Sequence, residues 1–232
     1  MSGSAVIIGA SGGIGAALEA ALIEEEAFDV VHGFARSRSR SQHIDLEDET
    51  TIAAAAETVA KGPPPSLVII ATGLLHDGDR GPEKSMRELD AEWLARNYAI
   101  NTIGPALIAK HFLPLGQKGV KSTFAALSAR VGSISDNKMG GWYGYRASKA
   151  ALNMMIRSLA IEEKRRNDRS IVVALHPGTV DTTLSKPFQG NVQPGRLFET
   201  GRAAVQLLDV IDGLKVTDSG RIFAWDGAEI PA

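Results

Sequence analysis

The chain has 232 residues, a formal net charge of -2, a hydrophobic share of 44% and no cysteine. This length suits one large α/β domain or two small ones, and the composition provides a full core. The small net charge gives no support to nucleic-acid binding, and the lack of cysteine excludes disulfides and thiolate metal sites. With no signal-peptide pattern and no apolar run long enough to span a membrane, we expect a soluble cytoplasmic protein without a metal.

A continuous apolar run over residues 5–9 is typical of a strand buried in a parallel sheet. A glycine turn with the spacing Gly9-x-x-x-Gly13-x-Gly15 follows at once, and residues 16–26 have a helical pattern. Glycines permit a tight turn and close approach of a ligand, while the helix N-terminus offers free N–H groups to a pyrophosphate. Ser11 and Gly12 lie in the same turn. The pattern favours a dinucleotide site; the alternative is a turn that only packs helix on sheet.

The second predicted strand, residues 29–35, ends in a basic loop that contains Arg36, Ser37 and Arg38. In a dinucleotide fold this loop meets the adenosine ribose, where an acid accepts from a free 2′-hydroxyl and an arginine accommodates a 2′-phosphate. No acid stands here, so the sequence favours NADP(H) over NAD(H). The alternative is a solvated basic loop.

Two further segments extend this predicted site. Asp45, in the extended segment 43–46, either meets the adenine or caps the helix predicted over 49–61, for which Asp48 is also a candidate. The buried strand predicted over 66–71 ends in Ala71, Thr72 and Gly73, a second place where backbone approaches the cofactor. The polar loop 74–85 is expected at the mouth of the site.

A long helical stretch covers residues 86–116, with Asn97, Asn101 and Gly104 inside it. Asparagine competes for backbone hydrogen bonds within a helix, so Asn101 beside Gly104 suggests a kink that serves a site; the alternative is an ordinary exposed turn. The next strand, 120–127, leads to Ser128 and Ser133. Ligands of open α/β sheets bind at the carboxyl ends of strands, which places both serines near the expected site.

Tyr145 and Lys149 stand four residues apart in a helix predicted to run to about residue 166, so they share one helix face. A cation about 4 Å from a phenol is worth roughly 4 kcal/mol at an effective dielectric of ~20, enough to make the phenol a usable acid or base. The pair therefore predicts proton transfer, although such pairs also arise by chance.

The remaining segments complete the pattern. A strand over 170–175 ends in a turn with Pro177, Gly178 and Thr182, and residues 183–198 form a lid-like loop. A helix over 199–211 and a strand over 220–225 follow. Strands alternate with helices about seven times, which predicts one domain over residues 1–232: a doubly wound Rossmann fold with a parallel seven-stranded sheet and helices on both faces.

These motifs, in this order and spacing, resemble the short-chain dehydrogenase/reductase family over nearly the full length. Within this family, the chain is similar to the C-factor-like, carbonyl-reductase-related branch in three stretches of sequence: residues 132–153, the turn at 175–182 and the ending at 223–231. The resemblance implies that Tyr145 is the proton donor or base, that Lys149 lowers its pKa and holds the nicotinamide ribose, and that Asn101 holds a water of the proton relay.

The resemblance also implies a cofactor site with four parts. Gly9, Ser11, Gly13, Ile14 and Gly15 would line the phosphates, and Arg36 with Ser37 would meet the 2′-phosphate. Asp45 and Leu46 would flank adenine, with Ala71 and Gly73 at the adenosine ribose. Pro177, Gly178, Val180 and Thr182 would surround the nicotinamide.

The sequence departs from the family pattern in two places. Ala71-Thr72-Gly73 stands where the family has Asn-Ala-Gly, which removes a polar side chain near adenine. Ala129 stands where the family has its substrate-orienting serine, so Ser128 and Ser133 are the candidate replacements. Loss of one preorganised hydrogen-bond donor lowers the rate of reaction by a factor on the order of 10²–10³.

The sequence thus predicts an NADP(H)-dependent oxidoreductase that acts on a small carbonyl compound or alcohol, with Tyr145 as proton donor or acceptor. The alternative is a non-catalytic NADP(H)-binding sensor or signalling protein, which Ala129 favours; a structural protein without cofactor is a third. Family members are usually homodimers or homotetramers, built on the helices that here span residues 90–116 and 144–166.

Overall fold

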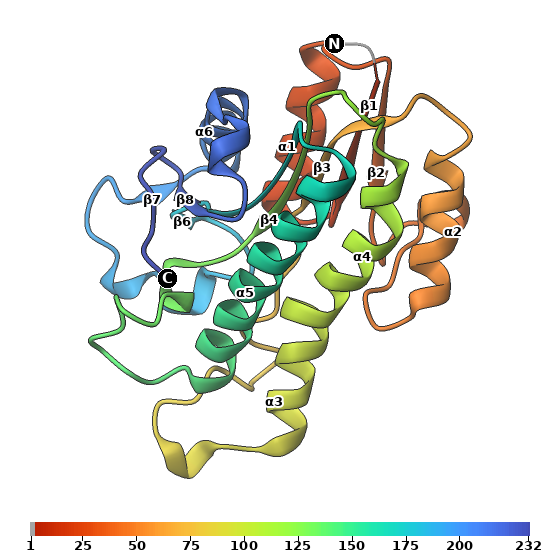
Figure 1. Cartoon of the computed structure of the whole chain (residues 1–232). Coiled ribbons are helices and arrows are strands. Elements are labelled where there is room, and N and C mark those ends of the chain that lie inside the picture. The colour runs from red at the N-terminus through yellow and green to blue at the C-terminus, as the bar shows by residue number, and fades with distance from the viewer. Residues whose placement is uncertain (1–2) are drawn as a thin grey trace.

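The computed structural model describes residues 3–232, apart from the side chains at positions 40 and 191. Its main sheet is parallel and has the strand order β2-β1-β3-β4-β5-β8 (Figure 1). The strands are β1 (Ser4–Ile8), β2 (Val30–Phe34), β3 (Pro65–Ile70), β4 (Ser122–Leu127), β5 (Ser170–His176) and β8 (Ile222–Ala224). The order reverses at β1, which places the carboxyl ends of β1 and β3 at the switch point where open α/β sheets bind ligands.

The predicted count of seven strands is wrong, because the main sheet in the described residues has six. The extended segment 43–46 makes only a single bridge, between Ala35 and His43. The backbone N–H of Asp45 donates to Thr51 Oγ1 at 2.8 Å, so this N–H is not free to pair with β2. Two short strands, β6 (Thr179–Val180) and β7 (Leu197–Phe198), pair in a separate small sheet.

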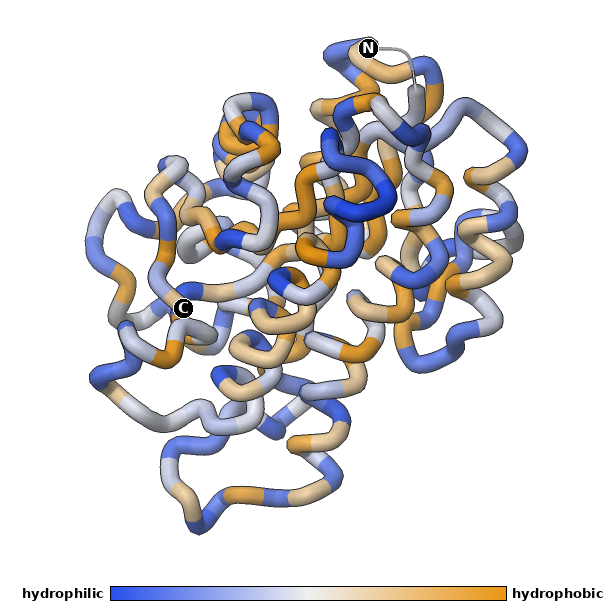
Figure 2. Tube along the Cα trace, viewed as in Figure 1, coloured by the Kyte–Doolittle hydropathy of each residue, from blue (hydrophilic) through white to orange (hydrophobic). Residues whose placement is uncertain are grey.

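Helices cover both faces of the sheet, as predicted. Side chains alternate along β1, so Val6 and Ile8 face one layer while Ala5 and Ile7 face the other. The first layer contains α2 (Glu49–Val59), α4 (Gly104–Phe112) and α5 (Tyr143–Arg166); the second contains α1 (Gly13–Glu24) and α6 (Thr200–Gly213). Hydrophobic residues concentrate in the strands between these layers (Figure 2). None of the helices within residues 3–232 is long and apolar enough to cross a membrane.

The long helical stretch is kinked at the predicted place. Helix α3 (Ala91–Tyr98) passes through a π-helical turn, Ala99–Ile103, before α4 begins at Gly104. A Cβ on Gly104 would lie 2.7 Å from Leu46 Cβ, so a glycine is needed for this close approach. The wider turn carries Asn101 inward, where its side chain is buried.

Candidate active site

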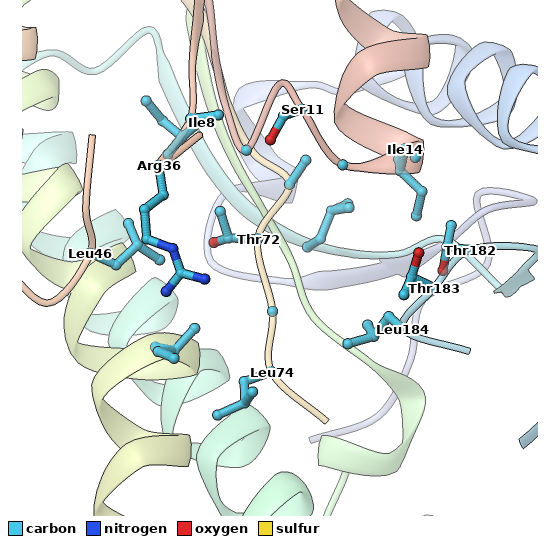
Figure 3. A pocket seen from close by; sticks show the side chains of 18 of the residues that line it. Ile8, Ser11, Ile14, Arg36, Leu46, Thr72, Leu74, Thr182, Thr183 and Leu184 are labelled. Carbon is cyan, nitrogen blue, oxygen red and sulfur yellow. The ribbon is translucent and has the colours of Figure 1, made fainter. Parts of the chain in front are cut away.

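A cavity of about 510 Å³ opens at the carboxyl ends of β1, β3, β4 and β5. Most of the predicted cofactor residues line it: Gly9, Ser11, Gly12, Gly13, Ile14, Arg36, Asp45, Leu46, Ala71, Thr72, Gly73, Lys149, Pro177 and Thr182. Tyr145 and Ser128 line the same cavity. Segments that are distant in sequence therefore meet around one space, with β3 and the segment after it between the two sides (Figure 3).

The glycine turn forms the first side of the cavity. Gly9 has φ +92°, and a Cβ on Gly15 would lie only 2.2 Å from Gly9 O, so the turn depends on both glycines. Helix α1 begins at Gly13, and no side chain caps its N-terminus. Its first N–H groups face a cavity lined by Ser11, Gly12 and Gly13, an arrangement that suits a phosphate group. Gly15 itself lies behind this lining.

Two arginines after β2 have different roles in the structure. Arg38 donates to the Glu19 carboxylate and to Gly33 O, the latter at 2.7 Å, so it fastens the loop to α1. The side chain of Arg36 extends into the cavity toward Leu46 (Figure 3). Ser37 is exposed and does not line the cavity. Of Arg36 and Arg38, Arg36 is therefore the cation that is available to a ligand in the cavity.

Asp45 and Leu46 form the adjoining part of the lining. Of the two acids considered as helix caps, Asp48 caps α2 by accepting from the Thr50 N–H at 3.0 Å. Asp45 Oδ1 accepts from the Glu47 N–H at 3.1 Å and remains at the cavity. Thr72, which also lines the cavity, has a buried hydroxyl without a hydrogen-bond partner among the described residues. The site thus has a polar side chain, that of Thr72, next to Ala71, the position where the family has an asparagine.

The opposite side of the cavity comes from the chain after β5. Pro177, Thr182, Thr183 and Leu184 line it, and Figure 3 shows the last three grouped at this side. Gly178 and Val180 stand behind this lining. His76 Nε2 lies 3.1 Å from Thr183 O and joins the mouth loop 74–85 to the predicted lid.

Tyr145 and Lys149 lie buried on α5, one helical turn apart. Lys149 Nζ donates to Leu127 O at 2.8 Å and lies 5.8 Å from the centre of the Tyr145 ring. Burial raises the pKa of Tyr145 to about 12 and lowers the pKa of Lys149 to about 7. Desolvation of the phenolate therefore dominates the ionisation of Tyr145 in this structure and disfavours its charge. The lowering of the Tyr145 pKa by Lys149 stays a prediction.

The carboxamide of Asn101 ties three segments together. Its Oδ1 accepts from the Leu74 N–H at 2.8 Å, and its Nδ2 donates to Leu74 O at 2.8 Å and to Ser148 Oγ at 3.0 Å. A Cβ on Gly73 would lie 3.6 Å from Asn101 Oδ1 and 3.7 Å from Lys149 Nζ, so both side chains flank the same glycine. Asn101 thus fixes the segment after β3 against α5. Its role as the holder of a relay water stays a prediction.

Neither candidate serine presents a free hydroxyl beside Tyr145. Ser128 lines the cavity, but its Oγ donates to Asn153 Oδ1 at 2.7 Å. Ser133 is buried outside the lining, and its Oγ accepts from the Asp136 N–H at 3.2 Å. Ala129 packs instead against Tyr145 and Leu75. The position that the family gives to a serine is therefore part of an apolar contact.

This apolar cluster contributes two of its members, Tyr145 and Leu184, to the cavity lining. It consists of Leu75, Ala129, Val131, Trp142, Tyr145, Leu184 and Phe188. The rings of Trp142 and Phe188 meet edge to face with centroids 5.1 Å apart, and Trp142 meets Tyr145 at 6.3 Å. Phe188 comes from the 3-10 turn Lys186–Asn191 in the predicted lid. The surroundings of the Tyr145 ring on this side are thus uncharged.

The mouth loop 74–85 and the lid-like loop 183–198, both expected near the site, contribute Leu74, His76, Asp77, Thr183 and Leu184 to the lining. Sequence reasoning did not assign the remaining lining residues to the site: Ile8, Ala35, Ile44, Glu47, Arg96, Ile100 and Leu127. All of these except Arg96 directly adjoin a predicted site residue along the chain, which is the signal that was present. Arg96, on α3, forms an ion pair with Asp77 of the mouth loop.

Solved structures share this architecture. The chain matches the NADPH-bound carbonyl reductase from chicken fatty liver with a TM-score of 0.81, 24% identity and full coverage of both chains. It matches the carbonyl reductase Sniffer of D. melanogaster with a TM-score of 0.80, 22% identity and full coverage of both chains. At this level of identity, these structures establish the fold.

Sequence relatives establish the family. C-signal of Myxococcus xanthus is 35% identical over 147 residues, which are 63% of this chain and 83% of that protein. Short-chain dehydrogenase srdF of Neurospora crassa is 32% identical, over 82% of this chain and 74% of that protein. The family model for short chain dehydrogenase matches residues 4–192. The chain therefore belongs to the short-chain dehydrogenase family of oxidoreductases.

Proposed function

We propose that this protein is an NADP(H)-dependent reductase of an uncharged carbonyl compound. One observation carries the proposal: Tyr145 and Lys149 line the same cavity as the glycine turn and Arg36. A phosphate-binding turn, a free cation and a buried proton donor thus face one space. Bound NADPH would supply a hydride to the carbonyl carbon while Tyr145 gives its proton to the carbonyl oxygen.

The ionisation of Tyr145 favours the reductive direction. A phenol with a pKa of about 12 keeps its proton at neutral pH and can donate it as negative charge develops on the carbonyl oxygen. Alcohol oxidation requires the phenolate as base, so its rate should rise with pH. Lys149, at 2.8 Å from Leu127 O, is fixed where it reaches the cavity and can hold a ribose hydroxyl.

The cofactor preference follows from the loop after β2. Arg36 offers its guanidinium to the cavity, and the end of β2 carries no acid that could accept a ribose 2′-hydroxyl. An arginine pairs with a phosphate through charge-assisted hydrogen bonds. The fold shared with an NADPH-bound carbonyl reductase supports the same choice.

The apolar cluster around Tyr145 favours an uncharged substrate. Burying a charged group there without a partner costs several kcal/mol, whereas an apolar substituent gains from contact with Trp142 and Phe188. With Ala129 at the serine position, Tyr145 is the principal side-chain donor for the carbonyl oxygen. We therefore expect modest rates and preference for reactive aldehydes, ketones and quinones.

The test is NADPH oxidation with a panel of such carbonyl compounds, followed by the loss of NADPH absorbance. Tyr145→Phe should lower kcat by at least ~10³ if the phenol is the proton donor, with the affinity for NADPH unchanged. Tyr143→Phe, on the same first turn but 39% exposed, is the matched control and should keep its activity. Equal rates for the wild type and Tyr145→Phe would refute the proposed role.

A second candidate is a protein that binds NADP(H) without turnover and acts as a sensor. Three observations favour it: the Ser128 hydroxyl already donates to Asn153, Ser133 lies outside the cavity lining, and Ala129 offers no donor beside Tyr145. Tight NADPH binding with no oxidation across the whole panel would support this candidate over the reductase.

A further inference from the structure

Glu83 is a buried carboxylate outside the cavity, in the loop between β3 and α3. Its side chain is 3% exposed. Its Oε2 accepts from the Gly144 N–H at 3.0 Å, and its backbone O accepts from the Trp142 N–H at 2.5 Å. Glu83 therefore makes two contacts with the residues that begin α5, the helix that carries Tyr145 and Lys149.

Helix α5 does not cap itself. Its N-cap residue, Trp142, has φ +51° in the left-handed region and makes no capping hydrogen bond with its side chain. The first turn contains no acidic residue, although the helix is 24 residues long. The first backbone N–H groups of α5 therefore need a hydrogen-bond acceptor from elsewhere in the chain, and the positive end of the helix dipole favours an acidic one. Glu83, 61 residues away in the sequence, provides that acceptor.

The packing around the carboxylate is close. A Cβ on Gly144 would lie 2.9 Å from Glu83 Oε1 and 3.3 Å from Leu94 Cδ2, so any larger residue here would force both side chains to shift. Glu83 Oε1 itself is buried without a hydrogen-bond partner in the described chain. A buried carboxylate oxygen without a partner is unfavourable for stability, so stability alone does not explain an acid here.

We propose that Glu83 is a positioning residue that fixes the N-terminus of α5 and thereby sets both the place and the ionisation of Tyr145. Tyr145 is the third residue of the helix, directly after Gly144, so a displaced first turn displaces the phenol. The proposal rests on the proposed function of Tyr145 as proton donor.

The carboxylate also has an electrostatic effect with a definite sign. Four charged or titratable groups belong to the segments packed around Tyr145. Lys149 lies 5.8 Å from the centre of its ring, and Arg146, the next residue, donates to Gly141 O and Val131 O. The His76 ring meets Phe188 of the same apolar cluster, and Glu83 accepts from the N–H of Gly144, the residue before Tyr145. The negative charge of Glu83 opposes the positive end of the helix dipole and disfavours the phenolate. Removing that charge should therefore lower the pKa of Tyr145, by roughly half to one pH unit.

The experiment compares Glu83→Gln and Glu83→Ala with Glu88→Gln, an exposed glutamate of the same loop region, as the control. Tyr145 ionisation is followed by tyrosinate absorbance in the full-length protein, as the difference between each variant with Tyr145 and the same variant with Tyr145→Phe. This readout needs neither substrate nor turnover. NADPH affinity, kcat and KM are measured on the same proteins.

We expect Glu83→Gln to lower the Tyr145 pKa and to lower kcat several-fold with NADPH affinity within about twofold of the wild type. Glu83→Ala should lower kcat further, because it also loses the acceptor for the Gly144 N–H; a donor–acceptor pair of this kind is worth up to roughly tenfold. A kcat that is higher in Glu83→Gln than in Glu83→Ala would show that the hydrogen bond from the Gly144 N–H contributes to the rate.

An unchanged Tyr145 pKa in Glu83→Gln, or a kcat no lower than that of Glu88→Gln, overturns the inference. If the wild type reduces no carbonyl compound but Glu83→Gln still lowers the Tyr145 pKa, the inference holds and the proposed function fails. Should Glu83→Ala not fold, Glu83→Gln retains the acceptor and decides the question alone.

Discussion

Lys149 Nζ lies 5.8 Å from the centre of the Tyr145 ring and donates to Leu127 O, so the two side chains that lie one helical turn apart are buried together. Burial affects their ionisation in opposite directions, since the neutral phenol and the neutral amine are both favoured. Burial of Lys149 therefore costs stability wherever its amine is protonated in the unfolded chain, so this cost depends on pH.

Lys149→Met should stabilise the protein at low pH and lose this advantage as the pH rises. The pKa of Lys149 falls from 10.5 to about 7 on folding, so the unfolded chain binds more protons between these values and wild-type stability rises with pH across that window. Below pH ~7 the full penalty of roughly 5 kcal/mol acts on the wild type, offset in part by the bond to Leu127 O. Above pH ~10.5 the penalty is gone.

The measurement is urea unfolding of both proteins at about pH 6, 8 and 10, compared as free energies of unfolding. Lys164→Met is the control, because Lys164 lies exposed near the end of the same helix and should show no such trend. A stability difference between Lys149→Met and the wild type that stays constant with pH would show that Lys149 is not desolvated.

Ala129→Ser should raise the rate of carbonyl reduction. A hydroxyl at this position would stand in the cluster beside Tyr145 and offer the carbonyl oxygen a second donor. We expect a gain in kcat of roughly tenfold, below the 10²–10³ lost when an optimised donor is removed. Ser128→Ala is the companion variant; since the Ser128 hydroxyl already binds Asn153, its kcat should stay near that of the wild type. The opposite ranking would make Ser128 the substrate-orienting group.

The sequence predicts most of this cavity because its motifs follow local rules. A strand, a glycine turn and a helix in succession require the backbone of Gly9 and Gly15 to approach closely, and the structure places Gly9 O 2.2 Å from where a Cβ of Gly15 would be. The kink at Asn101 follows equally from a poor helix former beside Gly104. Both features therefore leave a local signal in the sequence, although the contacts of Asn101 with Leu74 and Ser148 appear only in the fold.

Features that depend on long-range contacts escape prediction. Nothing in the sequence around Ser128 indicates a partner for its hydroxyl, because only the fold brings Asn153, 25 residues away, into contact with it. The extended segment 43–46 makes a single bridge to Ala35, and the N–H of Asp45 binds Thr51, a contact that composition does not reveal. Glu83 reads as one acid in a polar loop, yet it lies buried against Gly144, 61 residues away.

Gly15→Ala and Gly12→Ala should separate the stability of the turn from its affinity for a phosphate. A Cβ on Gly15 would lie 2.2 Å from Gly9 O, so Gly15→Ala must open the turn; we expect a loss of a few kcal/mol in the free energy of unfolding. A Cβ on Gly12 would meet Gly9 O at 3.4 Å, an ordinary contact, but would enter the cavity. Gly12→Ala should therefore keep its stability and bind NADPH more weakly.

Thermal unfolding and NADPH titration distinguish these two outcomes. Gly190→Ala provides a control, since nothing lies within 4 Å of its Cβ position. If Gly12→Ala bound NADPH as tightly as Gly190→Ala, the phosphates would not lie against the glycine turn.

Arg36→Ala should weaken NADPH far more than NADH. The guanidinium of Arg36 faces the cavity, and a charge-assisted hydrogen bond to a phosphate is worth about 1.5–3 kcal/mol, or roughly 10–100-fold in Kd. NADH lacks the 2′-phosphate, so its Kd should change less than about threefold. Arg38→Ala is the matched control two residues away: it breaks the contacts with Glu19 and Gly33 O and should lower stability without changing the NADPH to NADH ratio. Equal losses for both cofactors in Arg36→Ala would remove the 2′-phosphate assignment, because a general loosening of the loop affects the two dinucleotides alike.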